Sequence, residues 1–222
     1  MPSHFQRLAR IMDFILSTAF GVFLAAAFAL AITPGPGIAY VVARTVSGGR
    51  SEGFASTAGT AVGGLAHVLA AALGISVLIA KSAAAFAVVK YVGAAYLIYL
   101  GVRALRASTH RVSVDEVTSV GSARAFAEGI AVEVLNVKTA VFFLAFIPQF
   151  VDPAHALIPQ FVFLGSICVV LNTAADVVAV VFAAKLLDRS QSKQSHSRVL
   201  NLVSGTTMLA LGAYVALARS ER

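Results

Sequence analysis

The sequence predicts an all-α, polytopic membrane protein, on the basis of its composition and its long uncharged stretches. Of its 222 residues, 59% are hydrophobic and only 12% are charged, whereas a soluble domain is usually about 45–50% apolar and about 25% charged. A helix needs roughly 20 apolar residues to cross a bilayer. The chain therefore forms one membrane domain, residues 1–222, with six predicted transmembrane helices at about 14–46, 54–80, 84–105, 124–150, 157–186 and 199–218.

Two interruptions of the apolar sequence divide this domain into corresponding halves. Pro34-Gly35-Pro36-Gly37 breaks the first span, and Asn136-Val137-Lys138 breaks the fourth, about 100 residues later. Three spans precede the connecting loop 106–123 and three follow it, so the second unit crosses the membrane in the opposite sense. This predicts a 3+3 inverted repeat with broken helices 1 and 4, in which repeat 1 covers about 12–105 and repeat 2 about 124–219.

The charge pattern argues against a nucleic-acid partner, although the net charge is +7. The cations lie in short loops rather than along one soluble face. Membrane lipid is therefore the expected surrounding partner. The single cysteine, Cys168, excludes an internal disulfide and a thiolate metal cluster. No cofactor and no metal site is expected.

The first break removes backbone hydrogen bonds. Pro34 and Pro36 each lack an N–H, so the carbonyls of Leu30 and Ile32 lose their helical partners. The adjacent glycines tolerate positive φ. Two interpretations stay open here. The segment is either an ordinary turn or structural kink, or an unwound stretch whose carbonyls and helix ends bind a substrate or ion.

Ionisable residues at membrane depth mark a candidate binding site. Glu133, Asn136 and Lys138 lie within six residues of the fourth span, and Asp176 stands alone in the fifth. Glu133 and Asn136 share a helix face, whereas Lys138 points away from it, which makes Asp176 the candidate partner of Lys138. One interpretation is a buried ion pair that locks two helices. The other is a substrate site, with carboxylates for an α-ammonium group and Lys138 or helix N-termini for an α-carboxylate.

Two carboxyl groups are candidates for coupling transport to protons. A buried acid far from any loop, as Asp176 is, can carry a proton, which is the property that a proton-coupled antiporter needs. Glu133 is the second candidate. An intramembrane hydrolase is not supported, because Ser166 has no histidine on its own span to act as a base and a second membrane Asp is missing.

Small residues at i+4 spacing predict a packing face on the second span. The small residues are Ala55, Gly59, Gly63 and Ala71, and His67 occupies the position between the last two at the same spacing. Such a stripe allows close helix packing, so His67 is expected to face protein as a hydrogen-bonded packing residue. The stripe would serve a homodimer as well as internal packing.

Four further charged residues lie near predicted span ends. A long charged side chain there can reach the membrane surface. We therefore expect solvated anchors at these four positions: Arg44, Lys90, Glu128 and Lys185.

Three stretches carry a specific resemblance. They are Thr33–Gly37 followed by Ser47–Arg50 and Gly53, then Lys90–Gly101, then Leu135–Val151. In this order they resemble the start, the third span and the fourth-span signature of the LysE/RhtB superfamily of bacterial amino-acid exporters. The resemblance covers nearly the whole chain. It implies a secondary active exporter of amino acids or their derivatives in the bacterial inner membrane, driven by protons, and not an enzyme. A metal-cation exporter of the same superfamily is the alternative.

The sequence departs from the family pattern in two places. The family usually has Pro where this chain has Val137, and valine restores an N–H, so the second break is expected to be milder. The family's first span also usually begins close to the initiator methionine. Residues 1–11 are therefore interpreted as an extension, with Met12 as a candidate start.

Overall fold

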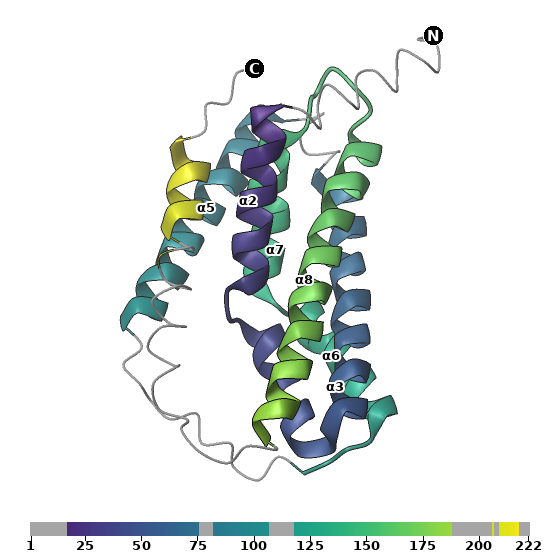
Figure 1. The fold of residues 1–222 in the computed structure, drawn as a ribbon. Coiled ribbons are helices and arrows are strands. Elements are labelled where there is room, and N and C mark those ends of the chain that lie inside the picture. Colours follow the sequence, from purple (N-terminus) through teal and green to yellow (C-terminus); the bar gives the residue numbers. More distant parts are fainter. Residues whose placement is uncertain (1–16, 76–81, 107–117, 188–205, 207–208, 218–222) are drawn as a thin grey trace.

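The computed structural model describes residues 17–75, 82–106, 118–187, 206 and 209–217, and these residues are helical apart from short connections (Figure 1). This confirms the all-α class. The helices and helical turns are α2 (Thr18–Ile32), α3 (Pro36–Ala70), the π-helical turn η1 (Ala71–Ile75), α5 (Ala83–Arg106), α6 (Ser122–Val134), α7 (Val137–Val141), the π-helical turn η2 (Phe142–Phe146), the 3-10 turn η3 (Ile147–Phe150) and α8 (Leu157–Leu187).

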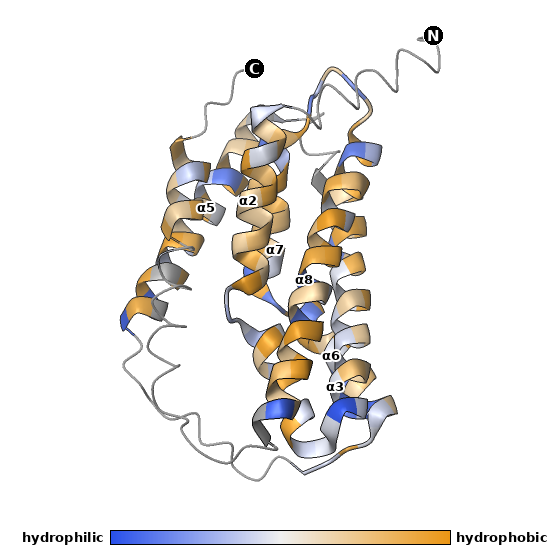
Figure 2. Cartoon of the chain, in the orientation of Figure 1, coloured by the Kyte–Doolittle hydropathy of each residue, from blue (hydrophilic) through white to orange (hydrophobic). Residues whose placement is uncertain are grey.

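Two helices in the described ranges are long and apolar enough to cross a membrane, Pro36–Gly74 and Leu157–Lys185. A third span results if Ser122–Val134 and Val137–Phe150, which meet at a bend of 43°, are counted as one broken helix. Thr18–Ile32 and Ala84–Leu100 are shorter apolar helices. Figure 2 shows hydrophobic residues along the lengths of the helices and strongly hydrophilic ones mainly near their ends. The six-span inverted repeat stays a prediction.

Several sequence predictions fall outside the described residues. The extension 1–11 and the candidate start Met12 do so, as do the end of the second predicted span at 76–81, most of the connecting loop at 107–117, and much of the sixth span.

Helix α3 contains a turn in its middle. Gly49 has φ 72° and ψ −169°, a conformation that glycine adopts at no steric cost and other residues rarely do. In Figure 1 the first part of α3 descends from the end of α2, and its second part rises again beside α8. The turn lies between the predicted end of the first span and the predicted start of the second.

A polar cluster fixes the Gly49 turn to the start of α6. Glu52 is only 2% exposed, and its Oε1 accepts hydrogen bonds from the Ser119 hydroxyl and from the N–H groups of Val120 and Gly121. Because Glu52 follows Gly49 closely in the chain, these bonds hold two distant segments together at this end of the molecule.

Two of the expected anchors belong to the same cluster. Arg44 pairs with Glu128 at 3.1 Å, and the exposed fractions of the two side chains are 13% and 31%. The Tyr40 hydroxyl also donates to Glu128. The solvated position expected for Arg44 is therefore wrong, because its side chain is largely buried against Glu128 where α3 packs on α6, whereas Glu128 stays partly exposed.

The expectation for Lys90 is also wrong. Lys90 is 1% exposed, and its Nζ lies 5.2 Å from the centre of the Tyr91 ring. It lies about two turns inside α5 (Ala83–Arg106), and its low exposure shows that its side chain is enclosed by protein. Lys185, near the end of α8, is exposed as expected.

The small-residue stripe of α3 packs against α6. A side chain at Gly59 would collide with the carbonyl of Phe126 and approach Gly129 Cα, and Gly63 faces Ile130 and Glu133 in the same way. His67 Nε2 lies 2.8 Å from the carbonyl of Glu133, which confirms its packing role. The stripe is thus used within the chain, and the homodimer stays a prediction.

Candidate functional site

The two helix breaks meet inside the bundle. Helix α2 ends at Ile32 and α3 begins at Pro36, while α6 ends at Val134 and α7 begins at Val137. From the second break, Lys138 Nζ donates hydrogen bonds to the carbonyls of Leu30 (3.3 Å) and Thr33 (2.8 Å) at the first. Pro34 cannot donate to the carbonyl of Leu30, which therefore accepts from the N–H of Thr33 at 3.2 Å and from the lysine of the other break.

Glu133 organises the second break. Its Oε2 accepts from Asn136 Nδ2 at 3.0 Å and its Oε1 accepts from the Thr139 hydroxyl at 2.7 Å. Asn136 Oδ1 in turn accepts from the N–H of Lys138 at 3.1 Å, as an N-cap residue does. The bend of 43° persists although Val137 restores an N–H, because the Asn136 cap starts a new helix here.

Lys138 and Asp176 do not form the expected ion pair. Within the described ranges, the charged groups that lie within 4.0 Å of each other are Arg44–Glu128, Arg124–Glu128 and His155–Asp152. Lys138 instead donates to main-chain carbonyls, and Asp176 Oδ2 accepts from the Thr60 hydroxyl at 2.8 Å. The backbone carbonyls of the first break accept the hydrogen bonds of the Lys138 ammonium group. The prediction was wrong because it considered only a group of opposite charge as the partner of Lys138.

Gly35 and Gly37 serve the site through their lack of a side chain. A Cβ at Gly35 would lie 3.0 Å from Lys138 Nζ, and one at Gly37 would lie 2.9 Å from Glu133 Oε2. Positive φ occurs instead at Gly49 and Gly121 in the described part of the chain. The two glycines of the first break therefore let the side chains of the second break cross it.

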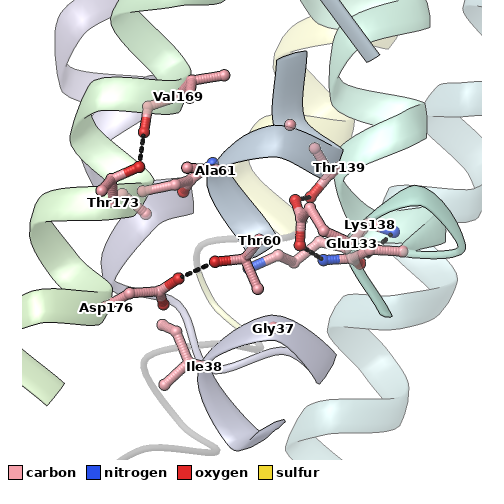
Figure 3. A pocket seen from close by; sticks show the side chains of 14 residues that line it. Gly37, Ile38, Thr60, Ala61, Glu133, Lys138, Thr139, Val169, Thr173 and Asp176 are labelled. Carbon is pink, nitrogen blue, oxygen red and sulfur yellow. Dashed lines mark hydrogen bonds between the residues drawn. The ribbon is translucent and has the colours of Figure 1, made fainter. Parts of the chain in front are cut away.

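A small cavity lies where the breaks face α8 (Figure 3). Its volume of about 30 Å³ gives room for about two water molecules, since a single water molecule needs at least about 10–15 Å³. Its wall comes from α2, both parts of α3, the second break and α8. The lining residues are Ala31, Gly37, Ile38, Thr60, Ala61, Gly64, Glu133, Asn136, Lys138, Thr139, Val169, Asn172, Thr173 and Asp176.

Only a few polar groups of this wall are open to a ligand. Asp176 is 4% exposed, and its Oδ1 accepts no hydrogen bond from any described residue, since Thr60 donates to Oδ2. The N–H groups of Gly37 and Ile38, in the first turn of α3, also have no acceptor there, and no side chain caps this helix start. Lys138 uses two of its three N–H donors.

The cavity includes five of the predicted site residues, Gly37, Glu133, Asn136, Lys138 and Asp176. Pro34, Gly35 and Pro36 do not line it, but they form the break that Lys138 bridges. Sequence reasoning missed Ile38, Thr60, Thr139 and Asn172. Only Asn172 gave a signal, because it lies one turn before Asp176 on the same helix face.

We expect Lys138→Met to destabilise the protein more than Glu133→Gln. Methionine keeps the length of lysine but leaves the Thr33 carbonyl without a donor and the Leu30 carbonyl with only the N–H of Thr33. A buried polar group without its partner costs about 1–3 kcal/mol. Glutamine at 133 can still accept from Asn136 and donate to the Thr139 hydroxyl. Thermal unfolding in detergent, followed by circular dichroism, compares the two variants. Lys185→Met, at an exposed position, is the control. Equal midpoints for the Lys138 and Lys185 variants would contradict the bridging role.

A bundle of apolar helices, in which two breaks meet around buried charged groups, is typical of membrane transport proteins. Residues 28–219 match the family model of LysE type translocators, so the chain belongs to the LysE family. It is thus a multi-pass protein of the bacterial inner membrane and a translocator, not an enzyme.

Relatives of similar length support this assignment. The chain is 30% identical over 194 residues to the homoserine/homoserine lactone efflux protein of Salmonella typhimurium, which covers 86% of this chain and 92% of that protein. It is 27% identical over 198 residues to an uncharacterized membrane protein of Vibrio cholerae, with 89% and 96% covered. A leucine efflux protein of Salmonella choleraesuis is 29% identical over 133 residues, with 59% and 62% covered. No solved structure matches the chain significantly.

Proposed function

We propose that this protein is a secondary active exporter of amino acids or amino-acid derivatives, coupled to protons. The family and the two efflux proteins among its relatives support this function. The observation that carries it is the cavity at the two breaks, where a buried carboxylate and a set of N–H donors are both open. A desolvated zwitterion needs these two kinds of partner.

In this proposal, the α-carboxylate of the substrate binds at the start of α3. The free N–H groups of Gly37 and Ile38 point out of a helix N-terminus, where the helix dipole favours an anion. The third N–H of Lys138 adds a charged donor. The α-ammonium group binds to Oδ1 of Asp176 on α8, the carboxylate oxygen that has no partner.

Glu133 takes a different part in the proposed site. Both of its oxygens already accept hydrogen bonds from its own segment, so its first task is to hold the second break in shape. Its expected role as a second coupling carboxylate stays a prediction. It would require Glu133 to release Asn136 or Thr139 during the cycle.

Coupling follows if a proton and the substrate compete for Asp176. A protonated carboxyl group loses its attraction for an ammonium group, so Asp176 would carry either the substrate outward or a proton inward. The cavity has room for about two water molecules, less than an amino acid needs, so in this proposal its walls separate for binding, as in alternating access. The metal-cation alternative has no support from the described residues, where no three His, Cys, Asp or Glu side chains gather as ligands.

Transport by the purified protein in liposomes tests the function. We expect radiolabelled homoserine, threonine or leucine to accumulate against its gradient when a pH difference of about one unit is imposed, at most about tenfold for one proton exchanged per substrate. Collapse of the pH difference with a protonophore should abolish accumulation, and protein-free liposomes are the control. Exchange of substrate at a rate and to an extent that do not depend on the pH difference would contradict the proposed proton coupling. Absence of any amino-acid flux would overturn the function.

A further inference from the structure

We propose that Asn172 recognises the side chain of the substrate and makes the site selective for small amino acids with a hydroxyl group. This inference rests on the proposed function. Asn172 lines the cavity and lies one helical turn before Asp176 on α8. If Asp176 binds the α-ammonium group, the neighbouring position on the same wall faces the rest of the substrate.

The side chain of Asn172 is free to bind. It forms no hydrogen bond with any described residue, and it is half-buried. The neighbouring polar side chains of the wall are engaged: Thr173 donates to the carbonyl of Val169 at 2.7 Å, and Thr60 bonds to Asp176 at 2.8 Å. An unpartnered carboxamide among satisfied neighbours is therefore the polar group available to a substrate side chain.

The chemistry of a carboxamide matches that of a hydroxyl. Asn172 offers both an acceptor oxygen and donor N–H groups, and a hydroxyl group can use either. The apolar part of the wall nearby is made of small residues, Ala61 and Gly64, with Val169. A leucine side chain would instead cover Asn172 and leave its polar atoms unpaired. Sites that hydrogen-bond a substrate hydroxyl reject analogues that lack it.

The test is competition for uptake into proteoliposomes. Homoserine and leucine each compete with radiolabelled homoserine, and the ratio of their half-inhibitory concentrations is measured for wild type and for Asn172→Leu. The side chain of leucine has the same number of heavy atoms as that of asparagine, with the same branching, and no polar atoms, although its two methyl groups are bulkier. In the Asn172→Leu variant we expect the ratio to change by about tenfold in favour of leucine as the substrate. The affinity for homoserine should fall and the affinity for leucine should rise. Asn172→Ser, which replaces the carboxamide by a hydroxyl that can still donate and accept a hydrogen bond, should shift the ratio less.

The matched control is Thr173→Val, one residue further along α8. The Thr173 hydroxyl is bound within its own helix, so this variant should leave the ratio unchanged. Rates are normalised to reconstituted protein that elutes as a single species, and Asn172→Ser serves if the leucine variant fails to fold. An unchanged ratio, or an equal loss for both amino acids, would overturn the assignment of Asn172. A wild type that transports no amino acid would overturn the proposed function itself.

Discussion

Asp176→Asn should abolish accumulation driven by a pH difference. Asparagine keeps the shape of the side chain and can still accept the hydrogen bond from Thr60, so the fold should survive. It cannot carry the coupled proton, so the accumulation ratio should fall to about one while exchange down a gradient continues. The lost charge also weakens the binding of an ammonium group by about 1.5–3 kcal/mol, which is tenfold or more in affinity.

Asp152→Asn is the control for this variant. Asp152 lies in the connection between η3 and α8 with an exposed side chain. The N–H of Ala154, with His155 beside it, holds the pKa of Asp152 below its usual range. This acid is ionised and outside the cavity, so its loss should leave transport unchanged. A normal pH-driven accumulation ratio in Asp176→Asn would exclude the coupling role.

Gly59→Leu should prevent stable folding. The main chains of α3 and α6 touch at this point, and any side chain at Gly59 would meet the carbonyl of Phe126. Overpacking usually costs about 1–3 kcal/mol and occasionally more. A collision with the main chain should cost an amount at the upper end of this range or above it, because no change of side-chain rotamer relieves it. We expect a large loss of monodisperse protein in detergent size-exclusion profiles of membrane extracts.

Gly21→Ala is the matched control for this substitution. Gly21 lies in α2, and a Cβ there would have no neighbour within 4 Å. Alanine also forms helix more readily than glycine, by about 1 kcal/mol. This variant should express as well as wild type. If Gly59→Leu gave the same profile as Gly21→Ala, the close contact between α3 and α6 would be wrong.

The sequence was sufficient to predict where the chain breaks and what the breaks contain. Proline removes hydrogen bonds at fixed positions, so Pro34 and Pro36 locate the first break without any knowledge of the fold. The i+4 spacing of Gly59 and Gly63 likewise predicts a packed face. These features depend on local geometry, which sequence spacing determines.

Contacts between distant segments were less predictable. Lys138 was expected to pair with a carboxylate, but its Nζ donates to the backbone carbonyls of Leu30 and Thr33 at the first break. Lys90 was expected at the surface, but its side chain is buried. Each outcome depends on which face of one helix meets another, and the helices of this chain are apolar on most sides. Hydrophobic periodicity then carries little information about direction, so a polar residue such as Thr60, which donates to Asp176, is placed at the site only by the fold.

The two ends of the bundle are held together by different forces. At the Gly49 turn, Arg44, Glu128 and Glu52 connect the segments through charges. At the opposite end, where the chain passes from α7 to the start of α8 (Figure 1), the rings of Phe146, Phe150 and Tyr214 pack together, with centroids 5.0–5.9 Å apart. Separating charged partners becomes easier as added salt screens them, whereas separating rings exposes apolar surface and changes the heat capacity. If the proposed exporter opens at its two ends in turn, the step that opens the Gly49 end should therefore respond to ionic strength. The step that opens the aromatic end should instead show a curved temperature dependence.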